Sequence, residues 1–208
     1  HIPGRFDKVL DVMECHLQAD LSNRIRNAVR KFAIENGFRF FDLVSQEGFL
    51  RNLIVRSTST GEWMVIVVFR EEDEEKRLKL LEHLRTEFPE ITSLIYIING
   101  KRNDTIFDQE VICFSGRDHL LEEMEGLKFK IRAKSFYQTN SRQALELYRI
   151  TRDFAGLTGS ENVYDLYTGT GTIALFVSRA ARHVSGIEYI EDAILDARDN
   201  AVSNGIKN

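Results

Sequence analysis

The chain has 208 residues, of which 43% are hydrophobic and 29% charged, with only two prolines. This composition excludes a disordered, collagen-like or low-complexity chain, and the length suffices for a buried core without disulfides. The net charge of -4, from 28 Lys and Arg against 32 Asp and Glu, excludes a generic polycation, so any contact with nucleic acid must use a local patch. No apolar run approaches the ~18 residues of a membrane span, and two cysteines are too few for a disulfide framework, so we expect a cytoplasmic protein without membrane contact.

The two ends of the sequence resemble cut ends. The chain starts at His1 without a methionine or a signal-peptide pattern, and it stops soon after a helix-ending Asn204-Gly205. We therefore expect a fragment of a longer protein.

The first part of the chain mixes helical and strand patterns. In chain order, hydrophobic spacing and turn residues predict a helix over 21–36, a hairpin of strands over 49–57 and 62–70, a helix over 74–88, strands over 91–98 and about 105–113, and a hairpin that turns at 124–126. In the second of these helices we expect Leu78, Leu81 and Leu84 to share the buried face. These elements predict a central α+β domain over residues 1–134.

From about residue 135 the pattern changes to alternating helices and strands. Asn140 is a candidate N-cap with Gln143 in capping-box register. The predicted elements are a helix from 140 to about 157, a strand over 162–166, a glycine loop over 167–171, a helix over 172–182, a strand over 183–188, and a helix over 191–204 that buries Ile190, Ala193, Ile194, Ala197, Ala201 and Val202. This order is the opening of a parallel α/β sheet, and two strands do not complete one. We therefore place a boundary near residue 134, followed by an incomplete α/β domain over 135–208.

The glycine loop is the strongest candidate for a binding site. Asp165 ends a strand, Gly169 and Gly171 follow it, and a helix begins at Thr172. Glycine permits positive φ and close approach of a ligand, and the helix start offers unpaired N–H groups. In open α/β sheets, ligands bind at this carboxyl edge of the strands.

Two cofactors, or no ligand at all, are compatible with this loop. The spacing Gly169-x-Gly171-x-x-Ala174 also matches the dinucleotide fingerprint, with Glu188 near the position of the ribose-binding acid. Asp165 favours S-adenosylmethionine, because a carboxylate there repels a pyrophosphate and attracts an ammonium or sulfonium group. In either case the carboxylate of Glu188 is expected to accept hydrogen bonds from two ribose hydroxyls. A purely structural turn is the third interpretation.

Three segments resemble the uracil-C5 RNA methyltransferases of tRNA and ribosomal RNA. Ser135 to Asn140 resembles the F-x-Q-x-N segment of that family, Asp165 to Ile173 its D-L-(Y/F)-x-G-x-G-(T/N) loop, and Asn200 to Asn208 the segment that leads into the third strand. The resemblance implies a class I, Rossmann-like methyltransferase domain that binds S-adenosylmethionine. It implies these cofactor-binding residues: Gln138, Asp165, Tyr167, Gly169, Gly171, Thr172 and Glu188.

The resemblance also implies a reaction for the full-length protein, the methylation of uridine C5 in structured RNA. In that family a cysteine thiolate adds to C6, C5 attacks the methyl group, and a base removes the C5 proton, with the target base out of its stack. The cysteine and the base are expected beyond residue 208, so we assign no catalytic residue here and expect this fragment to be inactive. The expected partner is tRNA or ribosomal RNA, in the second case as part of rRNA processing, and no obligate protein partner is evident. An NAD-type oxidoreductase and a non-catalytic RNA-binding module with a vestigial methyltransferase fold stay open.

The two cysteines have different interpretations. Cys15, followed by His16, resembles the fourth cysteine of a 4Fe–4S cluster in cluster-bearing members of the family. Such clusters need four thiolates, and the other three would lie upstream of His1, so a lone free cysteine is the alternative. Cys113 falls in an apolar strand pattern and is expected to be a buried thiol that is not the nucleophile.

A basic strand precedes the predicted boundary. Lys128, Lys130, Arg132 and Lys134 alternate with apolar residues, so period two places the four charges on one face, roughly 7 Å apart. This spacing suits a track of RNA phosphates. A strand with one solvated face is the alternative.

Overall fold

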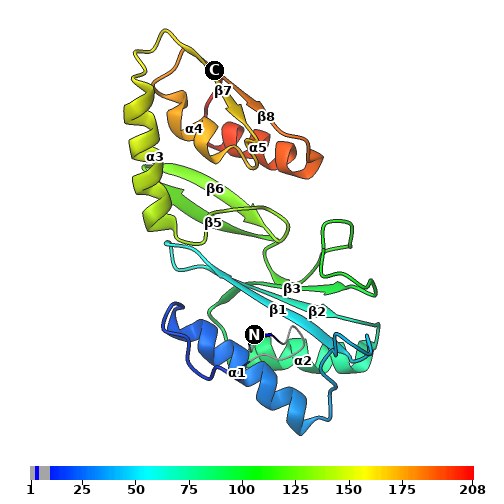
Figure 1. Cartoon of the computed structure of the whole chain (residues 1–208). Helices are drawn as coiled ribbons and strands as arrows, with labels where there is room; N and C mark the ends of the chain where they lie inside the picture. Colours follow the sequence, from blue (N-terminus) through cyan, green and yellow to red (C-terminus); the bar gives the residue numbers. More distant parts are fainter. Residues whose placement is uncertain (1–2, 5–9) are drawn as a thin grey trace. The chain divides into compact units, whose positions relative to one another are not determined.

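The computed structural model describes residues 3–4 and 10–208, and these form two compact units (Figure 1). The first unit contains the described residues of His1–Arg56 together with Trp63–Asp118, and the second contains Ser57–Glu62 and His119–Asn208. The division falls before the boundary predicted near residue 134, because the hairpin over 119–132 packs with the helices that follow it.

The first unit is a four-stranded sheet with two helices on one face (Figure 1). Its elements are α1 (Asp20–Glu35), β1 (Leu50–Ser57), β2 (Trp63–Phe69), α2 (Glu74–Glu87), β3 (Ile91–Ile98) and β4 (Ile112–Gly116). The strands lie in the order β1-β2-β3-β4; β2 and β3 are parallel, joined through α2, and β4 is antiparallel to β3. Helix α2 begins where predicted because the side chain of Asp73 accepts a hydrogen bond from the backbone N–H of Lys76.

The core of the first unit confirms the predicted helices but not every predicted face. In α2 the buried leucines are Leu80, Leu81 and Leu84, whereas Leu78 is 37% exposed, so its place on the buried face was wrong. The helical rotation explains the difference, because Leu80, Leu81 and Leu84 form one stripe and Leu78 lies beyond its edge. This stripe packs on Val65, Val67 and Phe69 of β2.

The last strand of the first unit differs from the prediction. β4 covers Ile112–Gly116 instead of about 105–113, because residues 99–105 form a loop whose carbonyl groups bind side chains. Cys113 is exposed, so the prediction of a buried thiol was wrong. β4 has only β3 as a neighbour, and the side chain of Phe114, not that of Cys113, packs against the core.

The second unit contains a hairpin followed by a β–loop–α–β–α segment. Its elements are β5 (His119–Met124), β6 (Leu127–Arg132), α3 (Ser141–Ala155), β7 (Asn162–Leu166), α4 (Thr172–Ser178), β8 (His183–Ile187) and α5 (Glu191–Ser203). β5 and β6 are antiparallel, and β7 and β8 are parallel, with Asn162 opposite His183 and Leu166 opposite Ile187. This confirms the opening of a parallel α/β sheet.

The ends of α3 show how the sequence sets its length. The side chain of Asn140 accepts a hydrogen bond from the N–H of Gln143 at 3.1 Å, which confirms the predicted cap. The helix ends at Gly156, which adopts a left-handed φ of 56°, rather than before Gly159. Its buried residues Ala144 and Tyr148 pack with Phe129 of the hairpin and Phe176 of α4.

A buried carboxylate holds the loop over 57–62 in place within the second unit. Glu122 is 1% exposed and accepts hydrogen bonds from Ser59 N at 3.0 Å and from the hydroxyl of Ser141 at 2.7 Å. Glu62 in turn accepts from Leu121 N at 2.7 Å. These bonds explain why a segment between β1 and β2 groups with the hairpin β5–β6.

Helix α5 buries a polar stripe, in contrast to the predicted apolar one. Asp196 and Asn200 are buried, whereas Val202 is 80% exposed and Ile190 is also exposed, so their place on the buried face was wrong. The reason is the open edge of β6, whose backbone needs partners. The N–H of Lys130 donates to Asn200 Oδ1 at 2.8 Å, and that of Lys128 donates to Asn204 Oδ1 at 2.8 Å.

Among the helices of the described chain, none has the length and apolar character to cross a membrane.

Candidate cofactor-binding site

The loop between β7 and α4 has the positive φ angles that its glycines predict, and Tyr167 shares them. The φ angles are 62° at Tyr167, 56° at Gly169 and 78° at Gly171. Glycine adopts such angles freely, whereas a tyrosine in this region costs about 1–3 kcal/mol. The loop therefore turns sharply at the carboxyl end of β7 and presents the Tyr167 side chain, 89% exposed, to solvent.

Asp165, at the end of β7, holds the loop against the first turn of α4. Its Oδ2 accepts hydrogen bonds from the Thr168 hydroxyl at 2.7 Å and from the N–H of Ala174 at 3.1 Å. Its Oδ1 accepts none from the residues that the structure describes. One oxygen thus shapes the loop, and the other remains an acceptor for a cationic ligand.

Glu188, just beyond the end of β8, ties that strand to the same loop. Its Oε2 accepts from Gly169 N at 3.0 Å, and its Oε1 accepts from Tyr189 N at 2.8 Å and Ile190 N at 3.0 Å. The hydrogen bond from Ile190, then those from Gly169 and Tyr189, lower the pKa of Glu188 below its usual value, so the carboxylate is ionised at neutral pH. A carboxylate has about four acceptor positions, and three are filled here.

Close packing around the loop requires two small residues. A Cβ on Gly171 would lie 3.1 Å from the Cβ of Ala197 in α5, and a Cβ on Gly186 in β8 would lie 2.9 Å from Cγ2 of Thr168. The glycine at 171 was predicted from the loop pattern. Gly186 was not, although a glycine inside a strand indicates close approach of another segment.

Asn200 is a second residue that the sequence reasoning missed. It is fully buried in α5, and its Nδ2 donates to the carbonyl of Thr170 at 3.2 Å while its Oδ1 accepts from Lys130 N. It therefore joins the glycine loop to the hairpin. The available signal was the spacing of Asn200 and Asn204, which places two amides on the face of a helix that should be apolar.

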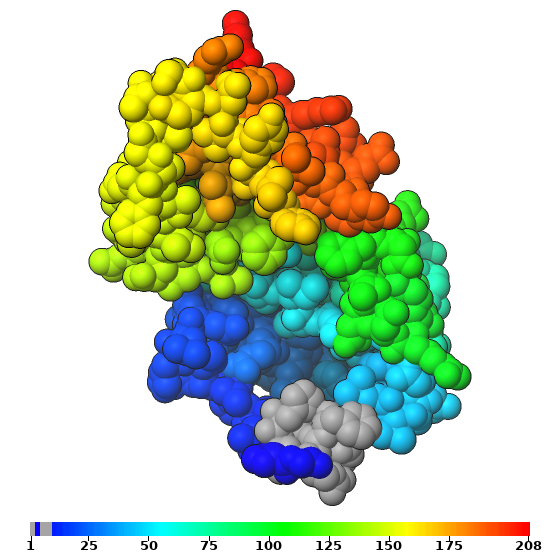
Figure 2. Space-filling view, turned by 45° about the horizontal axis from the view of Figure 1, so that its top comes forward, coloured from blue at the N-terminus to red at the C-terminus, as the bar shows by residue number. Residues whose placement is uncertain are grey.

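The structure brings most of the predicted cofactor residues together. Asp165, Tyr167, Gly169, Gly171 and Glu188 lie in or beside one loop, and the hydroxyl of the buried Thr172 lies 3.2 Å from that of Thr170. Gln138 is exposed ahead of α3, and no hydrogen bond in the described part of the chain links it to the loop. Figure 2 shows part of the stretch around β7, in yellow to orange, at the surface of the second unit, whereas α4 is almost entirely buried.

Exposed aromatic side chains flank the loop. Tyr189, directly after Glu188, is 94% exposed, and Tyr167 is nearly as exposed. Because Glu188 is bonded to Gly169, the backbone places these two tyrosines on segments that meet at the same carboxylate. Tyr189 was not among the predicted residues, and an aromatic residue directly after the strand-ending acid was the available signal.

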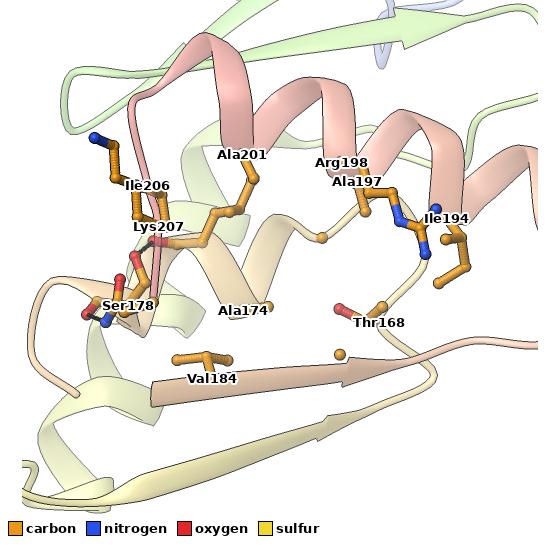
Figure 3. A pocket seen from close by; sticks show the side chains of 14 residues that line it. Thr168, Ala174, Ser178, Val184, Ile194, Ala197, Arg198, Ala201, Ile206 and Lys207 are labelled. Atoms are coloured by element: carbon orange, nitrogen blue, oxygen red, sulfur yellow. Dashed lines mark hydrogen bonds between the residues drawn. The ribbon is translucent and has the colours of Figure 1, made fainter. Parts of the chain in front are cut away.

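A cavity of about 350 Å³ lies on the other side of the loop, beneath α5 (Figure 3). Val184 of β8 and Ala174 of α4 face Ala201 and Ile194 of α5 across it. Thr168 and Gly171 reach it, but neither Asp165 nor Glu188 lines it. The cavity is therefore distinct from the carboxyl edge where the two acidic residues meet the glycine loop.

The predicted phosphate track is only partly available. Arg132 forms ion pairs with Asp196 and, at 2.9 Å, with Asp199, and it thereby lowers the pKa of Asp199. Its charge is neutralised by α5. Lys134 lies in the turn after β6, so its predicted place on the strand face was wrong. Lys128, Lys130 and Lys134 form no ion pair with any described residue, and an RNA contact by them stays a prediction.

Both cysteines lie far from the glycine loop in the sequence. Cys15 is half-buried ahead of α1, where its N–H donates to Asn23 Oδ1 at 3.0 Å. Residues 3–4 and 10–208 contain no cluster of three or more potential metal ligands. Cys113 is exposed as a residue, but desolvation of its thiol by neighbouring atoms, followed by the nearby Asp118, raises the pKa of the thiol, which disfavours the thiolate.

Known proteins resemble this chain along its whole length, although no family model matches it. It is 63% identical, over all of its length, to an uncharacterized RNA methyltransferase of Bacteroides thetaiotaomicron, of which it covers 46%. It is 36% identical over 98% of its length to an uncharacterized RNA methyltransferase of Halalkalibacterium halodurans, of which it covers 45%. It thus spans about half the length of these relatives.

A solved structure shows the same fold. The tRNA (uracil-54, C5)-methyltransferase of Pyrococcus abyssi, in complex with S-adenosyl-L-homocysteine, matches 98% of this chain with a TM-score of 0.79 and 25% identity, and the chain covers 49% of that protein. The mixed α/β architecture is therefore the fold of part of a Rossmann-like methyltransferase, and the sequence relatives reported above are named RNA methyltransferases.

Proposed function

We propose that the protein containing this chain is an S-adenosylmethionine-dependent methyltransferase that acts on C5 of a uridine in tRNA or ribosomal RNA. The observation that carries the proposal is the meeting of Asp165 and Glu188 at one glycine loop, with Gly169 N bonded to Glu188 at 3.0 Å. Two acidic side chains at the carboxyl edge of β7 and β8 suit a cofactor with a sugar and positive charge.

Each part of the cofactor has a candidate partner at this edge. Asp165 Oδ1 would accept from the ammonium group, and Glu188 would accept from the ribose hydroxyls. Three backbone N–H groups already donate to Glu188, so only about one acceptor position is open. To accept from both ribose hydroxyls, Glu188 must lose one of these backbone hydrogen bonds or share an acceptor position with it. Tyr167 and Tyr189 offer exposed aromatic faces for the adenine.

The same hydrogen bonds argue against a dinucleotide. A pyrophosphate at this loop would use backbone N–H groups of the glycine segment and of the helix start. Here the N–H of Gly169 is bonded to Glu188 and that of Ala174 is bonded to Asp165. Two negative side chains therefore already occupy donors that a pyrophosphate would need.

The choice of uridine C5 rests on sequence likeness. The F-x-Q-x-N segment with Gln138 and the glycine loop resemble uracil-C5 enzymes, and the Pyrococcus abyssi protein is named as one. A cysteine and a base for that chemistry, and three further cysteines if Cys15 binds a 4Fe–4S cluster, would come from parts of the protein outside these 208 residues. Residues 135–208 are proposed to supply cofactor binding, and residues 1–134 contacts with RNA.

Calorimetric titration with two ligands tests the cofactor site. We expect the full-length protein to bind S-adenosylmethionine and not NAD, and we expect Asp165→Asn to weaken the binding of S-adenosylmethionine, because the ammonium loses a charged partner. The change is isosteric and keeps an oxygen that can accept from Thr168 and Ala174. Binding of NAD in preference to S-adenosylmethionine, or unchanged binding of S-adenosylmethionine by Asp165→Asn, would contradict the proposal.

A further inference from the structure

The carboxyl ends of β2 and β3 form a second edge of the kind at which α/β proteins bind ligands. These strands are parallel and joined through α2, so their ends meet on one side of the first unit. Arg70 follows β2 and Asn99 follows β3, and the N–H of Asn99 donates to the carbonyl of Phe69 at 2.8 Å. None of the residues at this edge belongs to the cofactor site.

The loop over 99–105, green in Figure 1, is held in one shape by two buried side chains. Asn99 is fully buried, and its Nδ2 donates to the carbonyls of Asn103 at 3.3 Å and Thr105 at 3.2 Å. The side chain of Arg51 is also fully buried and donates to Asn103 O at 2.8 Å and Asp104 Oδ1 at 3.0 Å. Arg51 is thus saturated with acceptors, and its role is to fix the loop.

Arg70 is the opposite case, a guanidinium that lacks acceptors. Its Nε is buried and has no hydrogen-bond partner, and the described residues offer it no ion pair. Its Nη1 lies 3.1 Å from the position that a Cβ on Gly100 would take, so the glycine makes room for it. A buried donor without a partner costs about 1–3 kcal/mol, which an incoming acceptor would recover.

The surrounding charges leave this edge open to an anion. The carboxylates near it have other partners: Glu72 pairs with Arg77, Asp73 with Lys76, Asp104 with Arg51, and Asp108 with Lys101. Arg102, at the tip of the loop, is exposed and forms no ion pair within the described chain. The neighbouring acids Glu71, Glu74, Glu75 and Glu110 form no ion pair with described residues, and all four are exposed.

We propose that Arg70, Gly100 and Arg102 form a site for a phosphodiester of the RNA backbone. A planar guanidinium matches two oxygens of a phosphate, and Gly100 allows the phosphate to approach the loop closely. RNA as the source of the phosphate rests on the proposed function. Such a contact positions the RNA and carries no base specificity.

Three variants of the full-length protein test the site: Arg70→Gln with Arg102→Gln, Gly100→Ala, and the control Arg30→Gln. Arg30 lies on α1 and is already paired with Asp11 at 2.7 Å. The readout is the affinity for a fluorescent single-stranded RNA at several salt concentrations. Loss of two phosphate contacts should reduce the slope of log K against log salt by about 1.4, and Gly100→Ala should weaken binding with no change of charge. Arg30→Gln should leave both unchanged.

Three further results decide the outcome. If the double variant has the same RNA affinity and the same salt slope as Arg30→Gln, the proposed phosphate site is refuted. Competition by inorganic phosphate at concentrations comparable to RNA phosphate indicates a small-anion site and also overturns it. Binding of S-adenosylmethionine, measured in parallel, should be the same in all variants. If the protein does not bind this cofactor but the double variant still lowers the salt slope of RNA binding, the proposed function fails and the phosphate site stands.

Discussion

Replacement of Glu188 by alanine is expected to weaken the binding of S-adenosylmethionine about 5- to 150-fold. The variant removes the carboxylate proposed to accept from the ribose, and hydrogen bonds to a charged group contribute about 1–3 kcal/mol. It also removes the acceptor of Gly169, Tyr189 and Ile190 N–H groups, so the melting temperature of the second unit should fall. Titration calorimetry with the full-length protein measures the first effect and circular dichroism the second.

Glu161, which precedes the other end of β7, provides a matched control. Its carboxylate accepts from Thr158 N at 2.8 Å, Gly159 N at 3.1 Å and Ser160 N at 3.2 Å, so Glu161→Ala also strips three backbone donors of their acceptor. It should lower stability and leave cofactor affinity unchanged. Unaltered affinity in Glu188→Ala, or an equal loss in the two variants, would refute the assignment of Glu188 to the ribose.

Three other predictions follow from the same contacts. Asn200→Leu should weaken cofactor binding, measured by calorimetry, because it frees the carbonyl of Thr170 and lets the glycine loop move. Replacement of Lys128 and Lys130 by glutamine should reduce the salt slope of single-stranded RNA binding by about 1.4. The charge of Arg132 is already paired, so Arg132→Gln should change the slope little. Hydrogen bonds from the Thr158 hydroxyl and then from the Thr158 N–H lower the pKa of Glu161 from 4.5 to about 2. The contribution of the Glu161 carboxylate to stability is therefore present above pH 4.5 and is lost as the pH falls towards 2. Glu161→Gln should flatten the fall of melting temperature over that range.

Local sequence patterns predicted the elements that depend on local chemistry. Asn140 caps α3 because its side chain reaches the N–H of Gln143 three residues away, a geometry that the sequence alone determines. Gly169 and Gly171 adopt the positive φ that a strand–loop–helix turn demands. The parallel pair β7 and β8 likewise follows from two apolar strands separated by a helix.

The predictions that were wrong depend on contacts between distant segments. Asp196 and Asn200 are buried because the edge of β6, some 70 residues earlier in the chain, requires partners, and helical periodicity carries no information about that edge. β4 starts late because the fully buried Arg51, far upstream, binds the loop that was expected to be a strand. Cys113 is exposed because β4 lies at the sheet edge, which an apolar strand pattern does not reveal.

Methyl transfer from labelled S-adenosylmethionine to a uridine-containing RNA tests the proposed function most directly. The full-length protein should place the label on C5 of uridine, and the 208-residue chain should transfer none, because the thiolate that attacks C6 is expected outside it. Failure of the full-length protein to label RNA, or label on another base or atom, would contradict the proposal. Labelling of C5 by the 208-residue chain would show that Cys15, Cys113 or another of its residues replaces the expected nucleophile.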